Sequence, residues 1–531
     1  MKLTFYGAAK SVTGSCHCVE CNGKKVLIDC GLQQGKDEYD NREFDFRPSE
    51  IDAVIVTHAH IDHSGRLPLL VKEGFDGPIY CTGPTAQLME VMLLDSAHIQ
   101  EGEAKWQNQK GKRSGKPEVE PLYTVDDVPP AVKLFVPCQY NKEYQLFEGI
   151  NMRMLDAGHL LGSAFVELWL DEGEERRKIV FSGDIGNCDQ PVLRDPTPVY
   201  DADYVVTEST YGTRPHGDET KDYTEALADV IDRTLERGGN VVIPSFAVGR
   251  TQELLYFLRE MKEQNLVTSY PDFKVYVDSP LAREATQIFS GDLRGYLEDE
   301  AVALIKSGTK LFTFPGLTVT ATTEESRMLN EDRTPKVIIS ASGMCEAGRI
   351  RHHLKHNLWR RECSIVFVGY QAEGTLGRSI LNGAEVVHLF GEDVQVNAEI
   401  IRFKGLSSHA DKDHLITWAK NFNPAPKHTF CVHGQSDVTE IYAQTLRELA
   451  IPAHAPDPGE VYDLLTNRML VAGVPRAPKA PAELPASPAF RNLESVLRQL
   501  SNVVEHNRGG TNKDLEKFAN QLKLLAEKWD R

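Results

Sequence analysis

Short apolar runs, each bounded by Gly, Asp or Pro, recur along the first two hundred residues of the chain. Many are rich in β-branched residues, which is the composition expected of β-strands. Apolar residues at helical spacing across residues 85–100 predict a helix that covers these strands, and the polar residues 101–119 predict a helix end and a loop. The predicted strands are KLTFYG, KKVLIDCG, AVIVTH, PIYCTG, AFVELWL, RKIVFSGD and YVVTEST.

From about Tyr211 the pattern changes to strands that alternate with amphipathic helices. Strands NVVIPSF, KVYVDSP, KVIISAS and SIVFVGY are separated by helical segments such as GRTQELLYFLREMKEQ. This alternation is typical of βαβ units and predicts a second domain with a parallel sheet. Near Val394 the strand-rich character returns with AEIIRFKG and HTFCVHG.

After Gly473 a Pro/Ala-rich segment, VPRAPKAPAELPASPA, predicts a linker. Two helical apolar stripes follow it, with the turn and N-cap RGGTNKD between them. The stripes consist of Leu493, Val496, Leu497 and Leu500, and of Leu515, Phe518, Leu522, Leu525 and Trp529. Two interpretations remain open: a helical hairpin packed on its own chain, or a module that joins protomers into a homodimer or larger homo-oligomer.

Composition narrows the class of protein. The 531 residues have a net charge of −18, so a nonspecific coat on nucleic acid is not expected, although a local basic groove is compatible with an acidic body. No apolar run is long enough to span a membrane, and the first residues do not resemble a signal peptide. Ten cysteines are too few for a disulfide scaffold in a chain of this length, so we expect a reducing, cytoplasmic location.

The densest chemical signal is THAHIDH, which directly follows a predicted strand. His58 and His60 lie two residues apart and therefore point to the same side of the strand end, and Asp62 and His63 lie in the next turn. Imidazole and carboxylate groups are the ligand types of zinc. One four-coordinate ion cannot readily take all four side chains from so short a segment, whereas two adjacent ions can share them. The motif therefore predicts a metallohydrolase.

Together with three later segments, this motif resembles the metallo-β-lactamase superfamily. LIDCG places Asp29 where the family has an aspartate that orients the metal-binding histidines. DAGHLLGS supplies His159 as the expected single histidine, and FSGDIG supplies Asp184 as the expected bridging carboxylate.

Further segments resemble the β-CASP branch of that superfamily, in which a second domain is inserted into the hydrolase domain. Glu208 in TESTYG, His409 in GLSSHADKDHL and His433 in CVHGQ match its motifs. The segments GSCH, ASGMCEAGRIRHHL and GYQAEGTLGR are more similar to the endonuclease subunit of the cleavage and polyadenylation machinery, and to its prokaryotic relatives, than to ribonuclease J.

The resemblance implies an α/β architecture: a metallo-β-lactamase αββα sandwich, an inserted β-CASP α/β domain and, outside the resemblance, a C-terminal helical tail. The expected boundaries are 1–208 and 394–472 for the two parts of the metallo-β-lactamase domain, 209–393 for the β-CASP domain, 473–490 for the linker and 491–531 for the tail.

The resemblance also implies two zinc ions and a ribonuclease that hydrolyses single-stranded RNA. One zinc ion would take His58, His60, His159 and Asp184, and the other Asp62, His63, Asp184 and His433. The implied catalytic groups are Asp184, Asp29, and His409 as the general acid held charged by Glu208. We expect endonucleolytic cleavage, with 5′-exonuclease activity left open.

A nuclease also needs cationic and backbone-amide groups that contact the phosphates of its substrate. Arg250 follows a glycine at a predicted helix start, where an anion could meet a guanidinium and helix amides, but a solvent-facing role is equally compatible. Ser342 and Gly343 end a strand, and a basic segment follows. The candidate RNA contacts are Arg250, Ser342, Gly343, Arg349 and Arg378.

Three alternative functions remain at this point. A DNA nuclease of the same superfamily is disfavoured because that branch tends to have valine where this chain has His433. Hydrolases of small molecules lack the inserted domain and the Glu208/His409 pair. A non-catalytic, RNA-binding scaffold subunit would have lost metal ligands, whereas this chain has every expected one.

Overall fold

The computed structural model describes residues 1–475 except 36–40, 113–116, 217–222, 373 and 404–406, and in the tail residues 493, 496–497, 500–501, 503–504 and 506–529. The chain divides into two compact units, Met1–Arg476 and Ala477–Arg531. The first unit contains both expected domains and the whole candidate site.

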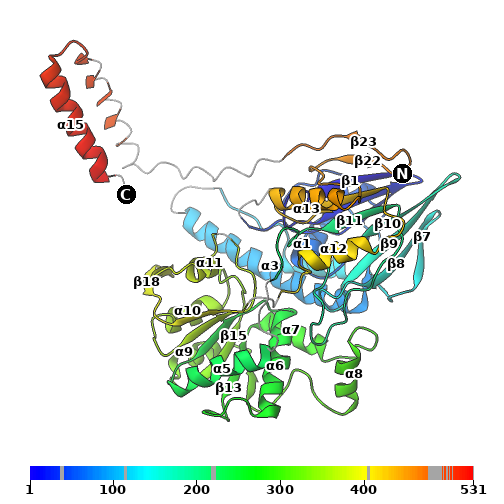
Figure 1. Ribbon diagram of the computed structural model, residues 1–531, viewed down its shortest axis with the longest axis horizontal. Helices are drawn as coiled ribbons and strands as arrows, with labels where there is room; N and C mark the ends of the chain where they lie inside the picture. Colours follow the sequence, from blue (N-terminus) through cyan, green and yellow to red (C-terminus); the bar gives the residue numbers. More distant parts are fainter. Residues whose placement is uncertain are drawn as a thin grey trace. The chain divides into compact units, whose positions relative to one another are not determined.

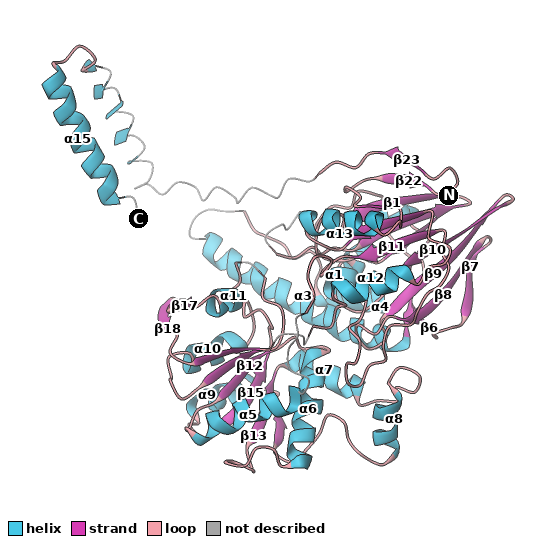
Figure 2. Ribbon diagram, viewed as in Figure 1, coloured by secondary structure: helices cyan, strands magenta, loops and turns pink. Residues whose placement is uncertain are grey.

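Two β-sheets form the centre of the first domain (Figures 1 and 2). The eight-stranded sheet has the order β23-β22-β1-β2-β3-β4-β5-β6 and the seven-stranded sheet the order β21-β20-β11-β10-β9-β8-β7. The first sheet consists of β1 Lys2–Gly7, β2 Cys16–Cys21, β3 Lys24–Ile28, β4 Ala53–Ile55, β5 Ile79–Thr82, β6 Phe135–Cys138, β22 Val461–Asp463 and β23 Arg468–Val471. The second consists of β7 Glu143–Phe147, β8 Ile150–Asp156, β9 Ala164–Glu172, β10 Glu175–Phe181, β11 Tyr204–Glu208, β20 His428–Val432 and β21 Ala453–His454.

Alternating side chains on these strands build separate apolar layers. Leu3 and Ile28 from the first sheet meet Leu168 and Phe430 from the second in the core between the sheets. Helices cover the outer faces, so the layers follow the predicted αββα order. The covering helices are α1 Ile61–Ser64, α2 Leu67–Lys72, α3 Gly83–Lys112 and α4 Val128–Val132 on one side, and α12 Lys412–Lys420 and α13 Ser436–Glu448 on the other, with short 3₁₀ turns at Pro48–Glu50 and Val125–Asp127.

Helix α3 is longer than the sequence pattern predicted. The polar residues from Glu101 onward were expected to form a helix end and a loop, but the helix continues to Lys112. The expectation was wrong because these residues are mainly Glu, Gln, Lys and Ala, which are good helix formers and need no buried face.

The inserted region forms a six-stranded sheet of order β14-β13-β15-β12-β16-β19 in which every pairing is parallel, as predicted. Its central strands are apolar on both faces: Val241 and Ile243 pack toward one helical layer, and Val242 toward the other. Its strands are β12 Val241–Pro244, β13 Lys274–Asp278, β14 Leu317–Val319, β15 Lys336–Ser340, β16 Ser364–Phe367 and β19 Glu399–Arg402, and a hairpin of β17 Val386–Leu389 and β18 Glu392–Gln395 lies beside it. Its helices are α5 Tyr223–Glu236, α6 Arg250–Gln264, α7 Pro280–Phe289, α8 Asp299–Lys306, α9 Thr323–Glu331, α10 Ile350–Asn357 and α11 Leu376–Leu381.

One strand belongs to a different sheet from the one expected. AEIIRFKG was assigned to the returning hydrolase domain, after a boundary at residue 393. In the structure β19 pairs with β16, so the inserted sheet extends to Arg402. A short apolar strand has the same pattern in either sheet, and therefore its partner could not be read from its sequence.

In the tail, α15 spans Asn512–Trp529, after a turn at Asn507–Gly509. The Thr511 hydroxyl accepts a hydrogen bond from the Asp514 amide at 3.3 Å, which confirms the predicted N-cap. The expected linker falls largely on residues 476–490, which lie outside the described residues.

Among the described residues, no helix is both long and apolar enough to cross a membrane.

The sandwich core predicts a specific stability effect. Leu168 is fully buried between the two sheets, so Leu168→Ala should lower the free energy of unfolding by about 2–5 kcal/mol through lost burial and a cavity. Glu175→Ala on the neighbouring strand, whose side chain is exposed, should change it by less than about 0.5 kcal/mol. Urea unfolding followed by circular dichroism measures both, and equal effects would contradict the assignment of Leu168 to the core.

Candidate metal centre

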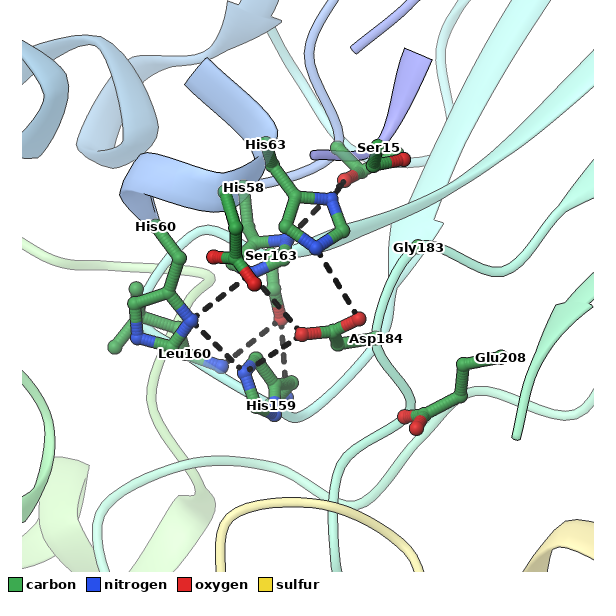
Figure 3. Close-up of polar contacts among 12 residues, drawn as sticks. Ser15, His58, His60, His63, His159, Leu160, Ser163, Gly183, Asp184 and Glu208 are labelled. Atoms are coloured by element: carbon green, nitrogen blue, oxygen red, sulfur yellow. Dashed lines mark hydrogen bonds and ion pairs between the residues drawn. The ribbon is translucent and has the colours of Figure 1, made fainter. Parts of the chain in front are cut away.

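Four segments of the chain bring the predicted ligands together at one edge of the sandwich. His58 and His60 follow β4, and Asp62 and His63 lie in α1. The other three, His159, Asp184 and His433, follow β8, β10 and β20. Figure 3 shows His58, His60, His63 and His159 gathered around Asp184. The structure therefore places side chains from positions up to 375 residues apart in one cluster, as 433 − 58 shows.

Among the described residues the cluster contains two sets of potential ligand atoms that share no residue, and a third set, Asp184, Glu208 and His433, that links them; within each set the atoms lie within 4.8 Å of one another. The first set is His58, His60, His159 and Asp184, and the second is Asp62, His63 and His433. Within the first, His60 Nδ1 lies 3.0 Å from His58 Nε2 and 3.2 Å from His159 Nε2. Within the second, His63 Nε2 lies 3.0 Å from His433 Nε2. The first set has the predicted members, whereas the second has Asp62, His63 and His433 without Asp184.

Asp184 lies between the two sets. Its Oδ2 is 3.4 Å from His58 Nε2, and its Oδ1 is 3.3 Å from His63 Nε2. The carboxylate is only 2% exposed, and within the described part of the chain Oδ1 has no hydrogen-bond partner. A buried anionic oxygen without a hydrogen bond is costly unless a cation compensates it. The donor set therefore fits a bound metal ion.

The protonation states of the imidazoles agree with this fit. Burial, followed by the charge of His58, lowers the pKa of His60 to about 3. Burial and the nearby His409 also hold the pKa of His159 well below its usual range. Both rings are neutral at pH 7 and can offer a lone pair to a metal ion. In contrast, burial lowers the pKa of His63 and of His433, but nearby carboxylates together outweigh it and raise both values: Asp184 and Asp29 act on His63, and Asp184 and Asp62 act on His433.

Asp29 orients His63, as the resemblance implied. Asp29 Oδ2 lies 2.7 Å from His63 Nδ1, and Oδ1 accepts a hydrogen bond from the Thr57 amide at 2.8 Å. The hydroxyls of Thr57 and Ser15 both donate to Oδ2 at 3.1 Å. This arrangement leaves His63 Nε2 facing Asp184. Sequence reasoning missed Thr57 and Ser15; the position of Thr57 directly before the histidine motif was the one available signal.

Other contacts of the cluster were also missed from the sequence. The Ser408 carbonyl lies 3.1 Å from His159 Nδ1, which leaves Nε2 for the first set. The Thr210 hydroxyl lies 3.1 Å from His433 Nδ1. A backbone carbonyl can be supplied by any residue, so no sequence pattern marks it.

His409 and Glu208 lie beside the cluster as a hydrogen-bonded pair. His409 Nδ1 is 3.2 Å from Glu208 Oε1 and 3.9 Å from Asp184 Oδ2. Burial lowers the pKa of His409, but Glu208 and Asp184 outweigh it and raise that pKa to about 9. Asp411, two residues later, caps α12 by accepting a hydrogen bond from the His414 amide at 3.0 Å.

Two predicted phosphate contacts do not face outward. Arg250 is buried and its guanidinium pairs with Glu253, so the alternative of a solvent-facing residue at the start of α6 is wrong, and its contact with phosphate stays a prediction. Arg349 donates to Asp278 at 2.6 Å, and His353 of the same basic segment lies 2.6 Å from that carboxylate. Arg349 therefore compensates a buried carboxylate 71 residues away in the sequence, whereas the partner of Arg250 is only three residues away in the same helix.

The remaining predicted contacts are Ser342, Gly343 and Arg378. Ser342 follows β15, and its hydroxyl is held within its own turn by Ala347. Gly343 lies directly against Phe246. Arg378 is in α11, where its amide donates to the hydroxyl of the capping residue Thr375.

The fold and the cluster define a class of protein, a metal-dependent hydrolase of the metallo-β-lactamase fold. Three family models match the chain: "Metallo-beta-lactamase superfamily domain" over residues 18–194, "Beta-Casp domain" over 251–380 and "Zn-dependent metallo-hydrolase RNA specificity domain" over 393–456. The chain belongs to the β-CASP family of metallo-β-lactamase hydrolases, as its motifs indicated.

Full-length relatives agree with this assignment. "Ribonuclease TTHA0252" of Thermus thermophilus is 38% identical over 438 residues, which cover 82% of this chain and 94% of the relative. "Transcription termination factor FttA" of Methanocaldococcus jannaschii is 32% identical over 461 residues, covering 85% of this chain and 69% of the relative. The protein of the same name from Methanosarcina mazei is 31% identical over 468 residues, which cover 86% of this chain and 70% of the relative.

The contacts of Asp29 generate a prediction about metal affinity. In Asp29→Asn the amide cannot accept hydrogen bonds both from the Thr57 amide and from His63, so His63 loses its orienting acceptor. Metal affinity should fall about 10- to 100-fold while the fold is retained. Equilibrium dialysis against graded zinc concentrations, with metal counted by mass spectrometry, measures the change.

Ser15→Ala is the matched control, because it removes one hydrogen bond to the same carboxylate and keeps the contact with His63. Its affinity should fall much less. If Asp29→Asn binds zinc with wild-type affinity, the Asp29 carboxylate does not contribute to metal affinity.

Proposed function

We propose that this protein is a dizinc ribonuclease that hydrolyses internal phosphodiester bonds of single-stranded RNA. The observation on which the proposal rests is the His409–Glu208 pair beside the histidine cluster, because it adds a proton donor to a metal centre. RNA as the substrate is supported by the matched RNA specificity region, which contains His409 and His433, and by the relative named a ribonuclease.

We assign the two sets of ligand atoms as the binding sites of the two ions. His58, His60 and His159 would hold one ion, Asp62, His63 and His433 would hold the other, and Asp184 would contribute to both. When bound, such ions supply Lewis acidity and lower the pKa of water into the neutral range. The chain itself fixes the geometry: Asp29 and the Ser408 carbonyl hold the outer nitrogens of His63 and His159.

His409 supplies the proton that the leaving ribose oxygen needs. Its Nδ1 faces Glu208, so this nitrogen donates to the carboxylate and Nε2 is free to donate to the substrate. Glu208 is fully buried and also accepts a hydrogen bond from the Ile185 amide at 2.6 Å, so its position is fixed. The raised pKa of His409 keeps the ring charged at pH 7.

This mechanism predicts that His409→Ala keeps the bound metal but loses about 10²–10⁴-fold in the rate of RNA cleavage. The measurement uses end-labelled and internally labelled RNA with a matched DNA strand, so that it separates RNA from DNA and internal from terminal cleavage. His388→Ala, which removes an exposed histidine on β17, should cleave at the wild-type rate. Undiminished cleavage by His409→Ala would remove this residue from the mechanism, and preferential cleavage of DNA would overturn the assigned substrate.

We also propose that the tail joins two copies of the chain, within a protein of the reducing cytoplasm. All ten cysteines are free, which supports a reducing compartment. Several apolar side chains of the two stripes are exposed, among them Leu493 at 62%, Leu497 at 61% and Leu525 at 54%. An apolar stripe of this size on a pair of helices is best buried against a second copy.

Replacing Leu493, Leu497 and Leu525 with Ser should therefore convert the protein from a dimer to a monomer. Light scattering coupled to size exclusion measures the mass, and RNA cleavage by the monomer checks that the first unit is intact. A variant with the mass of the wild type would contradict assembly through the tail.

A further inference from the structure

Three aromatic residues near the candidate site are not explained by core packing. Phe246 follows β12 and is 41% exposed, whereas Tyr211 after β11 and Tyr370 after β16 are half-buried. Most other phenylalanines of the sandwich and the inserted sheet are buried, so an exposed ring at a strand end requires a separate reason.

The ring of Phe246 lies against two glycines at the ends of neighbouring strands. A Cβ atom at Gly343 would meet the ring at 3.0 Å, and one at Gly369 would meet it at 3.7 Å. The backbone after β15 and β16 therefore supports the ring, which remains exposed in part. Because a side chain at Gly343 would collide with the ring, the glycine there keeps this position open.

A guanidinium joins the two tyrosines. Arg214 lies 4.6 Å from the ring centre of Tyr211 and 4.9 Å from that of Tyr370. Its side chain is exposed, and no carboxylate of the described residues forms an ion pair with it. The backbone of Arg214 is fixed, since its carbonyl accepts a hydrogen bond from the Lys412 amide at 3.2 Å. A planar cation held between two rings remains available to a further anion.

These residues form a continuous series that begins at the catalytic pair. The Tyr211 ring lies 6.2 Å from that of His409, Arg214 connects Tyr211 to Tyr370, and Gly369 connects Tyr370 to Phe246. The loop after Phe246 returns to the metal centre, where a Cβ at Gly249 would lie 3.0 Å from Leu160, the neighbour of His159. The ends of β12 and β16 lie at the carboxyl edge of a parallel sheet, where such sheets bind ligands.

We infer that Tyr211, Arg214, Tyr370 and Phe246 form a stacking track for unpaired bases of single-stranded RNA next to the scissile phosphate. The inference rests on the ribonuclease function proposed above and specifies its substrate contacts. Flat rings accept any base through its π-face, and the guanidinium between them meets the phosphate charge. A purely apolar ligand would not need the arginine. Bases held in a duplex cannot stack on the track, so it selects single strands.

The test compares RNA that has all its bases with the same strand containing abasic residues beside the cleavage site. Phe246→Leu and Tyr370→Leu keep an apolar side chain and remove the ring. For the complete strand each variant should raise KM about 5- to 150-fold, the range expected for one lost stack. In the wild type the abasic strand should raise KM similarly, whereas in the variants it should add little, because the stack is already absent.

Phe390→Leu is the matched control. Phe390 is an exposed ring beside the cation of Arg351, at 5.2 Å, and stacks on His352, but it lies at the β17–β18 turn. It should show wild-type KM on both strands. If wild-type protein cleaves RNA and the two track variants discriminate the strands as it does, the stacking track is overturned and the ribonuclease stands. If metal-loaded wild-type protein fails to cleave RNA, the proposed function itself falls.

Discussion

The structure depends on one buried carboxylate, that of Asp184, held where the two sheets of the sandwich meet the histidine loops. Ionised oxygens without water require compensation, and here imidazoles approach both oxygens at 3.3–3.5 Å. The close approach needs Gly183, whose φ is +51° and where a Cβ would meet Thr57 at 2.7 Å. Because residue 183 is a glycine, the loop after β10, which carries Asp184, can pack directly against the segment that contains His58.

The inserted domain is joined to the sandwich next to this histidine cluster. The chain leaves the sandwich after β11, directly beyond Glu208, and its return brings His409 back to that residue. The hydrogen bond between them joins positions 201 residues apart, so the insertion begins and ends at the proposed proton donor. A domain placed in this way can hold a polymer next to the metal centre without altering the ligands, and the aromatic series from Tyr211 to Phe246 begins at that junction.

The sequence predicted the site best where several potential metal ligands lie close together along the chain. The THAHIDH motif contains four potential ligands within six residues. The order of the later motifs identified His159, Asp184 and His433 as further ligands. The αββα layers and the parallel sheet were also predictable, because they follow from alternating and continuous apolar patterns. Contacts that depend on distant partners were not predictable: Arg349 was predicted to contact phosphate, but it pairs with Asp278, 71 residues away in the sequence. For the same reason, nothing in the local sequence marked Ser15 or the Ser408 carbonyl as partners of the site.

The most direct test of the account is anomalous X-ray diffraction from crystals of the protein grown with zinc, recorded on both sides of the zinc absorption edge. The account predicts two peaks, roughly 3.5–4 Å apart, on either side of the Asp184 carboxylate. One peak would lie among His58, His60 and His159, and the other among Asp62, His63 and His433. A well-ordered crystal with no peak at this cluster, or with zinc bound only elsewhere, would contradict the central claim that the buried carboxylate is shared between two metal ions.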